Sequence, residues 1–351
     1  MPSSPSGLGN RAEAVKAAAM DTVRLGRTGL KISRICLGTM TFGLQTDRAE
    51  SFAIMDVANE AGIDFIDVAD VYPVGGTLET VGRTEEIVGE WLAGKRERFV
   101  VATKVYNRVG PGPNDMGNAR RHVIDACEKS LRRLRTEFID LYYIHRWDPE
   151  TPIDETLAAF DDLRRAGKIR YAGCSNIAAW QMMSALWAAD RERTVRFDAV
   201  QPRYNLLYRA IEAELLPAAQ ANGVGAVVFN PLAAGVLTGK YKRGEQPQEG
   251  TRFTLGNAAS LYQQRYWQDA QLEVVEQLAR DVASRGKKLT HVALRWVLDQ
   301  PGVTAAIVGA SRAEQLRDSL GALKIELDDA DRRACDEAWY ALPRRRPEEE
   351  R

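Results

Sequence analysis

The sequence predicts an α/β fold, a (β/α)8 TIM barrel, on three observations. Short apolar, β-branched runs alternate with amphipathic helical stretches along the chain, which is typical of a parallel sheet with crossover helices. The strand-like runs number eight. No linker divides them into two halves, which favours one closed barrel over an open, doubly wound sheet.

The expected elements follow in order along the chain. A hairpin with a two-residue turn is expected at 23–33, where it can plug the floor of the barrel. The eight strands are expected at 34–39, 64–70, 99–105, 139–145, 169–176, 197–205, 224–231 and 304–311. Helical stretches between them include 48–62, 120–134, 153–167 and 212–223, several of which end in glycine, a residue that favours a helix C-terminus.

The connection after the seventh strand is long. Residues 240–267 are too polar and too many for a tight turn, so we expect a mobile flap, followed by an additional helix at 271–286 and a further one at the C-terminus. Residues 21–340 are expected to form a single barrel domain. Residues 1–20 are expected to be a flexible extension and residues 341–351 a solvated tail.

Composition excludes several classes of protein. Lys plus Arg number 48 and Asp plus Glu number 48, which argues against a dominant contact with nucleic acid or an anionic membrane. The four cysteines are scattered without CxxC spacing, so neither a metal site nor a disulfide framework is indicated. No run resembles a secretory signal or a membrane span. We therefore expect a soluble, cytoplasmic protein whose partner is a small molecule, with the oligomeric state left open.

Four polar residues stand at the carboxyl ends of neighbouring strands, where barrels of this kind carry their active sites. They are Asp67 with Tyr72 after strand 64–70, Lys104 in strand 99–105 and His145 at the end of strand 139–145. A phenol has a reference pKa of about 10, and the Lys104 ammonium is expected to lower it. Asp67 is expected to hold Lys104 charged and oriented, and His145 to orient a carbonyl oxygen.

A purely structural interpretation treats Asp67 and Lys104 as a buried ion pair and Tyr72 and His145 as polar rim residues. Buried ion pairs contribute little stability, because desolvation offsets much of the attraction between the two charges. The functional interpretation explains all four residues together, and we favour it.

A proton donor at a barrel mouth without metal ligands suggests carbonyl reduction with a bound hydride donor. The segments 308–316 and 230–241, after the last two strands, suit phosphate groups, with Ser311, Arg312 and Lys240 as polar partners and Arg252 in the flap. Capping of a helix is the alternative role for Ser311. A planar carboxamide can be hydrogen-bonded by Ser175, Asn176 and Gln201, and the nicotinamide ring that carries it can stack on Phe229. Each of these residues alone is more often structural.

The motifs DFIDVADVY, ATKV, QPRYNLLYR, NPLAAGVLTGKY and IVGASRAEQL closely resemble, in order, those of the aldo-keto reductase superfamily, which includes the β subunits of potassium channels. The resemblance spans residues 21–323. It implies NADP(H)-dependent reduction of an aldehyde or ketone, with Tyr72 as the general acid, Lys104 and Asp67 lowering its pKa, and His145 orienting the carbonyl. Arg312 favours NADP over NAD. The ribose of NAD has no phosphate, so it would leave the guanidinium without an opposite charge.

The same resemblance implies a set of cofactor and substrate contacts. The residues expected to contact the cofactor are Gly38, Thr39, Met40, Asp67, Ser175, Asn176, Gln201, Phe229, Asn230, Pro231, Leu232, Gly235, Leu237, Lys240, Arg252, Gly309, Ser311, Arg312 and Gln315. The residues expected to border the substrate are Met40, Tyr72, Tyr106, His145, Arg146, Trp147 and Tyr204.

The sequence departs from the family pattern at four places. Pro73 stands where a glycine is usual, and the stretch 73–86 resembles the extended loop of a bacterial subgroup, so the entry of the substrate does not follow from better-known members. Ser319 replaces an asparagine near the adenine, and Phe229 replaces a Tyr or Trp but can still stack. The same residues also fit two other functions. One is the NADP+-dependent oxidation of a sugar or alcohol. The other is redox sensing by a subunit that binds NADP(H) and turns over slowly.

Overall fold

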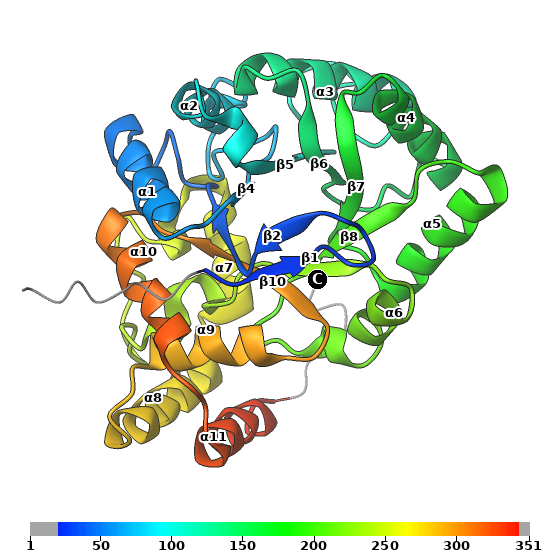
Figure 1. Cartoon of the computed structure of the whole chain (residues 1–351). Helices are drawn as coiled ribbons and strands as arrows, with labels where there is room; N and C mark the ends of the chain where they lie inside the picture. The colour runs from blue at the N-terminus through cyan, green and yellow to red at the C-terminus, as the bar shows by residue number, and fades with distance from the viewer. Residues whose placement is uncertain (1–19, 344–351) are drawn as a thin grey trace, which may run out of the picture.

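The computed structural model describes residues 20–343, so residues 1–19 of the expected extension and 344–351 of the expected tail lie outside the described residues. Eight parallel strands close into a barrel in the order β10-β3-β4-β5-β6-β7-β8-β9, and helices surround it (Figure 1). The predicted (β/α)8 fold is therefore confirmed.

The elements agree with the expected order. The barrel strands are β3 Ile35–Gly38, β4 Phe65–Asp67, β5 Val100–Val105, β6 Ile139–Ile144, β7 Ile169–Ser175, β8 Phe197–Gln201, β9 Gly225–Val228 and β10 Val303–Gly309. The helices are α1 Arg48–Glu60, α2 Arg83–Trp91, α3 Arg120–Leu134, α4 Ile153–Arg165, α5 Ala179–Glu192, α6 Leu215–Ala221, α7 Ala259–Tyr266, α8 Asp269–Ser284, α9 Leu289–Asp299, α10 Ala313–Ser319 and α11 Asp329–Tyr340. None of them is both long and apolar enough to cross a bilayer.

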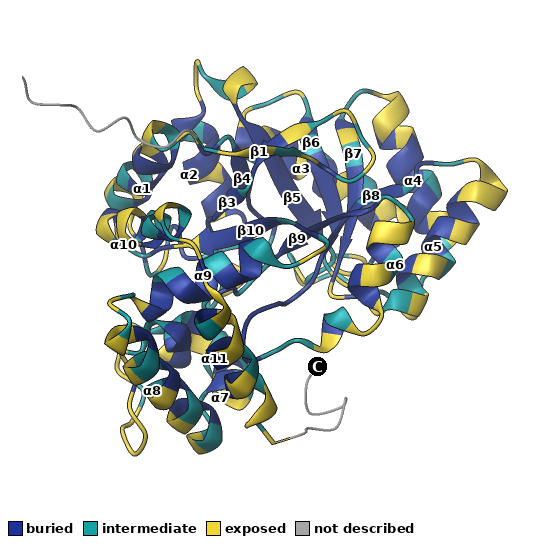
Figure 2. Ribbon diagram, turned by 60° about the horizontal axis from the view of Figure 1, so that its bottom comes forward, coloured by how far each residue is buried: buried dark blue, intermediate teal, exposed yellow. Residues whose placement is uncertain are grey.

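Alternation along the strands decides which side chains face the barrel axis. Successive side chains of a strand point to opposite faces, so every second residue lies inside. The inner apolar cluster is built from Cys36, Phe65, Val100, Ala102, Leu141, Tyr143, Ala199, Val227, Ala305 and Ile307, together with Leu25 and Ile32 of the hairpin. The other strand residues pack against the helices, whose outer faces are exposed (Figure 2).

Several strands end earlier than the apolar runs suggest. The run 64–70 pairs as a strand only to Asp67, and the run 197–205 only to Gln201. Pro202 follows Gln201 and lacks the N–H that the next ladder bond requires. The loops at the carboxyl ends therefore begin directly after the residues expected in the site.

The hairpin of β1 (Thr22–Arg24) and β2 (Lys31–Ser33) crosses the floor of the barrel (Figure 1). Its side chains Leu25 and Ile32 are fully buried in the inner cluster, as expected for a plug. The prediction of a two-residue turn is wrong: the amide of Leu25 donates to the carbonyl of Leu30 at 2.9 Å, so four residues form the turn.

Residues 240–267, which we expected to form a mobile flap, have secondary structure of their own. Two 3-10 turns (Arg252–Thr254 and Gly256–Ala258) lead into α7. The ring of Phe253 packs edge-on against Tyr241 at 5.2 Å and Trp267 at 4.7 Å between centroids, so the middle of the segment packs against its two ends. The side-chain nitrogen of Asn205 donates to the hydroxyl of Tyr266 at 3.0 Å, which ties the segment to the barrel. The predicted helix after this segment is α8.

The stretch 73–86, predicted as an extended loop, is a loop only to Gly82, because α2 begins at Arg83. The helix has no side-chain cap at Gly82, and so it lacks the Ser, Thr, Asp or Asn that marks a helix start in a sequence. At the other end of the chain, α11 packs against α8, and Asp331 of α11 accepts a hydrogen bond of 2.9 Å from Arg285, just beyond α8.

Gly26 in the hairpin turn provides a test of the plug. Its φ is 55°, and a Cβ would lie 2.3 Å from the carbonyl oxygen of Gly223 and 2.7 Å from the nitrogen of Gly225, at the start of β9. We expect Gly26→Ala to lower the free energy of unfolding by about 2–4 kcal/mol, because this backbone contact cannot relax and alanine disfavours a left-handed φ. The measurement is equilibrium unfolding in urea.

Gly29, in the same turn, has no heavy atom within 4 Å of a built Cβ. Gly29→Ala is therefore the control, with an expected change below about 0.5 kcal/mol. Equal losses in the two variants would show that the hairpin does not close the floor as described.

Candidate active site

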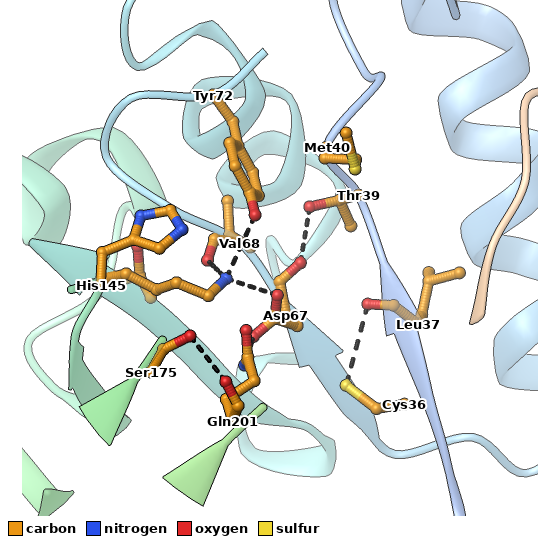
Figure 3. Close-up of polar contacts among 12 residues, drawn as sticks. Cys36, Leu37, Thr39, Met40, Asp67, Val68, Tyr72, His145, Ser175 and Gln201 are labelled. Carbon is orange, nitrogen blue, oxygen red and sulfur yellow. Dashed lines mark hydrogen bonds and ion pairs between the residues drawn. The ribbon is translucent and has the colours of Figure 1, made fainter. Parts of the chain in front are cut away.

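At the carboxyl ends of the strands, the next residue that faces the barrel axis is polar instead of apolar. Asp67 follows Phe65 by two residues, Lys104 follows Ala102, and His145 follows Tyr143. Tyr72 reaches the same region from the loop after β4 (Figure 3). The ring centroids of Tyr72 and His145 are 6.0 Å apart with an interplanar angle of 76°. The four residues predicted to act together therefore converge.

Lys104 is fully buried, and its three ammonium protons each have an acceptor. Nζ lies 2.5 Å from Oδ1 of Asp67, 2.6 Å from the carbonyl oxygen of Val68 and 3.5 Å from the hydroxyl of Tyr72 (Figure 3). The first two contacts are short, whereas the contact to Tyr72 is long. Asp67 and Val68 thus hold the ammonium of Lys104 in place, and its third proton faces the phenol of Tyr72.

Asp67 is held in place from three sides. Its Oδ2 accepts a hydrogen bond of 2.7 Å from Nε2 of Gln201, on the opposite side of the barrel. Its backbone carbonyl accepts from the hydroxyl of Thr39 at 2.8 Å. Burial raises the pKa of Asp67, and the charge and hydrogen bond of Lys104 oppose that shift. The carboxylate has little freedom to move away from Lys104.

The pKa of Tyr72 differs from our prediction. Burial raises it above the usual range, and the Lys104 charge opposes the rise without overcoming it. Burial is the largest cause, and the charge of Asp67 adds to the rise of the Tyr72 pKa. Lys104 lies 2.5 Å from Asp67 and 3.5 Å from the phenol. Burial lowers the pKa of Lys104, but the charges of Asp67 and Tyr72 outweigh it and the net shift is upward, so lysine stays charged and tyrosine protonated.

His145 is uncharged at neutral pH. Burial lowers its pKa well below the usual range, and the positive charges of Lys104 and Arg146 add to the shift. The amide nitrogen of Asn107 lies 2.9 Å from Nδ1. With that nitrogen as the donor, Nδ1 accepts and the ring proton is on Nε2, which makes Nε2 the hydrogen-bond donor.

Asp70, the third aspartate of the run 64–70, is buried behind the quartet. Among residues 20–343, no side chain hydrogen-bonds either of its carboxyl oxygens. Burial raises its pKa well above the usual range, and the charge of Glu85 adds to the rise. Glu85 itself is paired, since it accepts from Thr103 at 2.6 Å and from Arg133 at 2.7 Å.

A cavity of about 1500 Å³ opens above the quartet and extends toward the ends of β9 and β10. Of the residues predicted to contact a cofactor, all line it except Ser175 and Leu237. Ser175 is buried and donates to the carbonyl of Gln201 at 2.8 Å, and Leu237 is buried in the core. Ser311 does not cap α10, because the cap position is Arg312; its hydroxyl lies 3.1 Å from Gln315.

Only some of the residues predicted to border a substrate line the cavity. Met40, Tyr72, His145 and Arg146 line the cavity, whereas Tyr106, Trp147 and Tyr204 do not. Tyr204 is fully buried, and its ring lies tilted against Trp296 with the centroids 5.4 Å apart. Its hydroxyl donates to Glu212 at 2.5 Å. Alternation accounts for this place, because Ala199 and Gln201 face the barrel axis and position 204 falls on the opposite, outer face.

Three further residues at the cavity escaped the sequence analysis. Asn107 follows β5 by two residues, and its place after a strand was the available signal. Tyr262 and Arg265 lie on α7, inside the expected flap, where no strand end marks them. The hydroxyl of Tyr262 lies 3.8 Å from the sulfur of Met40.

The fold and the site define a (β/α)8 barrel with a protonated tyrosine, a buried lysine and a neutral histidine at the carboxyl ends of its strands. The sequence model of the aldo/keto reductase family matches residues 34–340. The chain belongs to the aldo/keto reductase family.

Curated relatives agree over nearly the whole chain. The "Uncharacterized oxidoreductase YrpG" of Bacillus subtilis is 42% identical over 320 residues, covering 88% of this chain and 93% of the relative. A "Probable voltage-gated potassium channel subunit beta" of Arabidopsis thaliana is 36% identical, covering 87% and 92%. The "L-glyceraldehyde 3-phosphate reductase" of Escherichia coli is 33% identical, covering 85% and 86%. The family and these oxidoreductases support carbonyl reduction as the general activity.

Asp70 gives a test of the buried charges. A carboxyl with a raised folded-state pKa adds stability below its unfolded pKa, near 3.9, and this stability is lost as the pH rises through the folded value. We expect Asp70→Asn to gain stability relative to the parent protein as the pH rises, by about 1.4 kcal/mol per unit within that window. Urea unfolding at pH 4.5, 6 and 8 measures the difference.

The control is Asp190→Asn, because Asp190 is exposed on α5. Its difference from the parent protein is expected to stay constant across the same pH range. A constant difference for Asp70→Asn as well would mean that Asp70 is ionised or solvated in the folded protein.

Proposed function

We propose that the protein reduces an aldehyde or ketone to an alcohol with NADPH, and that Tyr72 donates the proton. The observation that carries the proposal is the hydrogen-bonded series from Asp67 through Lys104 to Tyr72, whose members are 2.5 Å and 3.5 Å apart. A structural ion pair would not require a phenol at the end of the series, facing a cavity. The neutral histidine beside the phenol adds a second donor for the same oxygen.

The cavity has features that suit the phosphate groups of NADPH. Gly38 and Gly309 lie side by side, and a Cβ on Gly309 would approach the guanidinium of Arg252 to 3.2 Å, so the two glycines keep this wall open. The side-chain nitrogen of Asn230 is buried without a hydrogen-bond partner among the described residues. Lys240, Arg252 and Arg312 line the same part of the cavity and would hold the phosphate groups.

The roles of the protein's own residues follow from their protonation states. The reduced nicotinamide supplies the hydride when it is bound. Tyr72 stays protonated because burial raises its pKa, so it holds the proton that the new alkoxide needs. Lys104 stabilises the phenolate left behind, and Asp67 keeps Lys104 charged. Nε2 of His145 orients the carbonyl oxygen toward the Tyr72 hydroxyl.

Removal of the phenolic hydroxyl tests the proton donor. We expect Tyr72→Phe to lower kcat about 10²- to 10⁴-fold, because general acid catalysis contributes that much, while the Kd for NADPH changes less than about twofold. Steady-state NADPH oxidation with a panel of aldehydes and fluorescence titration of NADPH measure the two quantities. Tyr340→Phe, at a residue 67% exposed on α11, is the control. Unchanged turnover in Tyr72→Phe would reject Tyr72 as the acid.

Replacement of Arg312 tests the choice of cofactor. Arg312 is exposed at the start of α10, and its guanidinium is proposed to bind the 2′-phosphate that NAD lacks. We expect Arg312→Ala to reduce the preference for NADPH over NADH about 10- to 100-fold, the worth of a charge-assisted hydrogen bond. Ratios of kcat/KM for the two cofactors measure it. Arg317→Ala, on the same helix but paired with Glu60 at 3.6 Å, should leave the ratio unchanged.

A further inference from the structure

Asn107 contacts one of the reacting groups but has no part in the mechanism proposed above. It lies in the loop after β5, two residues beyond the end of the strand, and it borders the cavity. Its side-chain nitrogen lies 2.9 Å from Nδ1 of His145. The proposed mechanism uses the other ring nitrogen, Nε2, to orient the carbonyl oxygen. Asn107 therefore meets the histidine at the nitrogen that does not face the substrate.

The sheet fixes the backbone of His145 from both sides. Val105 pairs with Ile144 in the ladder of β5 and β6, and the amide of His145 donates to the carbonyl of Val105 at 2.8 Å. The carbonyl of His145 accepts a hydrogen bond of 3.0 Å from the side-chain nitrogen of Asn176, which follows β7. The imidazole thus extends from a backbone that both neighbouring strands hold in place.

The loop after β5 is closed on itself and attached to the loop after β6. The amide of Gly117 donates to the carbonyl of Tyr106 at 2.7 Å, which joins the two ends of the loop. Asn118 donates from its side chain to the carbonyl of Arg146 at 2.9 Å and from its backbone to Oδ2 of Asp148 at 2.8 Å. These contacts hold the loop without the amide that faces the histidine, so fixing the loop does not require that amide.

A neutral imidazole carries one proton, on Nδ1 or on Nε2, and the hydrogen bond at one nitrogen decides which. His145 is neutral because burial lowers its pKa, and the positive charges of Lys104 on β5 and Arg146 in its own loop lower it further. Tyr72, from the loop after β4, faces the ring edge-on with the centroids 6.0 Å apart. A side-chain N–H that points at Nδ1 requires a lone pair there, so it selects the tautomer with the proton on Nε2.

We propose that Asn107 is a positioning residue whose side-chain amide donates to Nδ1 of His145 and thereby keeps the ring proton on Nε2, where a carbonyl oxygen can accept it. What this proton does rests on the proposed function, but the tautomer is a property of the protein alone. A merely structural Asn107 would hold the ring without deciding which nitrogen carries the proton. The two roles therefore differ in a measurable quantity.

The tautomer is read directly by 15N NMR of the full chain labelled at histidine, because protonated and unprotonated nitrogens of a neutral imidazole resonate at different frequencies. The chain has three histidines, and the signals lost in His145→Gln assign the one in the site. In the parent protein at pH 8 we expect the proton on Nε2. In Asn107→Asp we expect it on Nδ1, because a carboxylate accepts a hydrogen bond and cannot donate one. The same tautomer in both proteins would overturn the inference.

The pH dependence of turnover gives a second readout. The new carboxylate raises the pKa of His145 in Asn107→Asp, because it favours the charged ring. Below that pKa both ring nitrogens carry protons and Nε2 still donates, whereas above it the single proton lies on Nδ1. We therefore expect kcat/KM of Asn107→Asp, relative to the parent protein, to fall about 10²- to 10³-fold as the pH rises through that pKa, the worth of one donor to a developing oxyanion.

NMR titration of the same variant gives the pKa of His145, so the pH range of the expected fall is measured. NADPH oxidation with an aldehyde that the parent protein reduces provides the kinetics. A relative kcat/KM that does not change across the measured pKa would contradict the inference, since a structural role predicts a loss that is independent of the charge of the ring.

Two further variants complete the test. Asn114→Asp adds the same charge at an exposed position of the same loop and should match the parent protein in tautomer and in pH dependence. Asn107→Ala removes the donor without offering an acceptor, so we expect both tautomers to be populated and kcat/KM at pH 8 to lie between those of the parent protein and Asn107→Asp. If Asn107→Asp does not fold, Asn107→Ala decides: a proton on Nε2 alone in that variant would reject the inference.

The NMR comparison also separates this inference from the proposed function. If the parent protein reduces no aldehyde but the ring proton moves from Nε2 to Nδ1 in Asn107→Asp, the proposed function fails and the role of Asn107 stands. If aldehydes are reduced and the tautomer is the same in both proteins, the role of Asn107 fails and the proposed function stands.

Discussion

The charged Lys104 ammonium inside the barrel is the interaction on which the rest of the site depends. Removing a charge from water costs several kcal/mol unless every proton finds an acceptor. Asp67 and the carbonyl of Val68 provide two short contacts, and Gln201 and Thr39 hold Asp67 from the other side. The third proton points to Tyr72 at a longer distance. The proton of Lys104 that Asp67 and Val68 do not accept thus points to the phenol of Tyr72.

Much of the arrangement could be predicted from the sequence, because it follows from the period of a strand. Eight apolar runs with helical stretches between them determine a parallel barrel, and its carboxyl ends determine the location of the site. Every second residue faces inward, so Asp67 and Lys104 had to meet once β4 and β5 were neighbours. The same rule placed Gly38 beside Gly309 in the cavity wall.

The features that escaped prediction depend on distances and on packing far along the chain. The pKa of Tyr72 is raised chiefly because the phenol is buried, and no spacing in the sequence encodes that burial. Tyr204 was assigned to the substrate, but it lies on the outer face of the barrel, where its ring packs against Trp296 of α9. In the segment 240–267, Phe253 packs against Tyr241 and Trp267, and Tyr266 of α7 is hydrogen-bonded to Asn205 after β8, which no local pattern in the sequence predicts.

The position of α7 has a consequence for how such a molecule can diversify. The four reacting groups are fixed by β4, β5, β6 and the loop after β4, whose geometry is constrained by closure of the sheet. Tyr262 and Arg265 stand instead on an insertion that shares no ladder with those strands. Exchange of this segment can therefore change the lining of the cavity while Asp67, Tyr72, Lys104 and His145 keep their positions, so the two parts of the site can evolve separately.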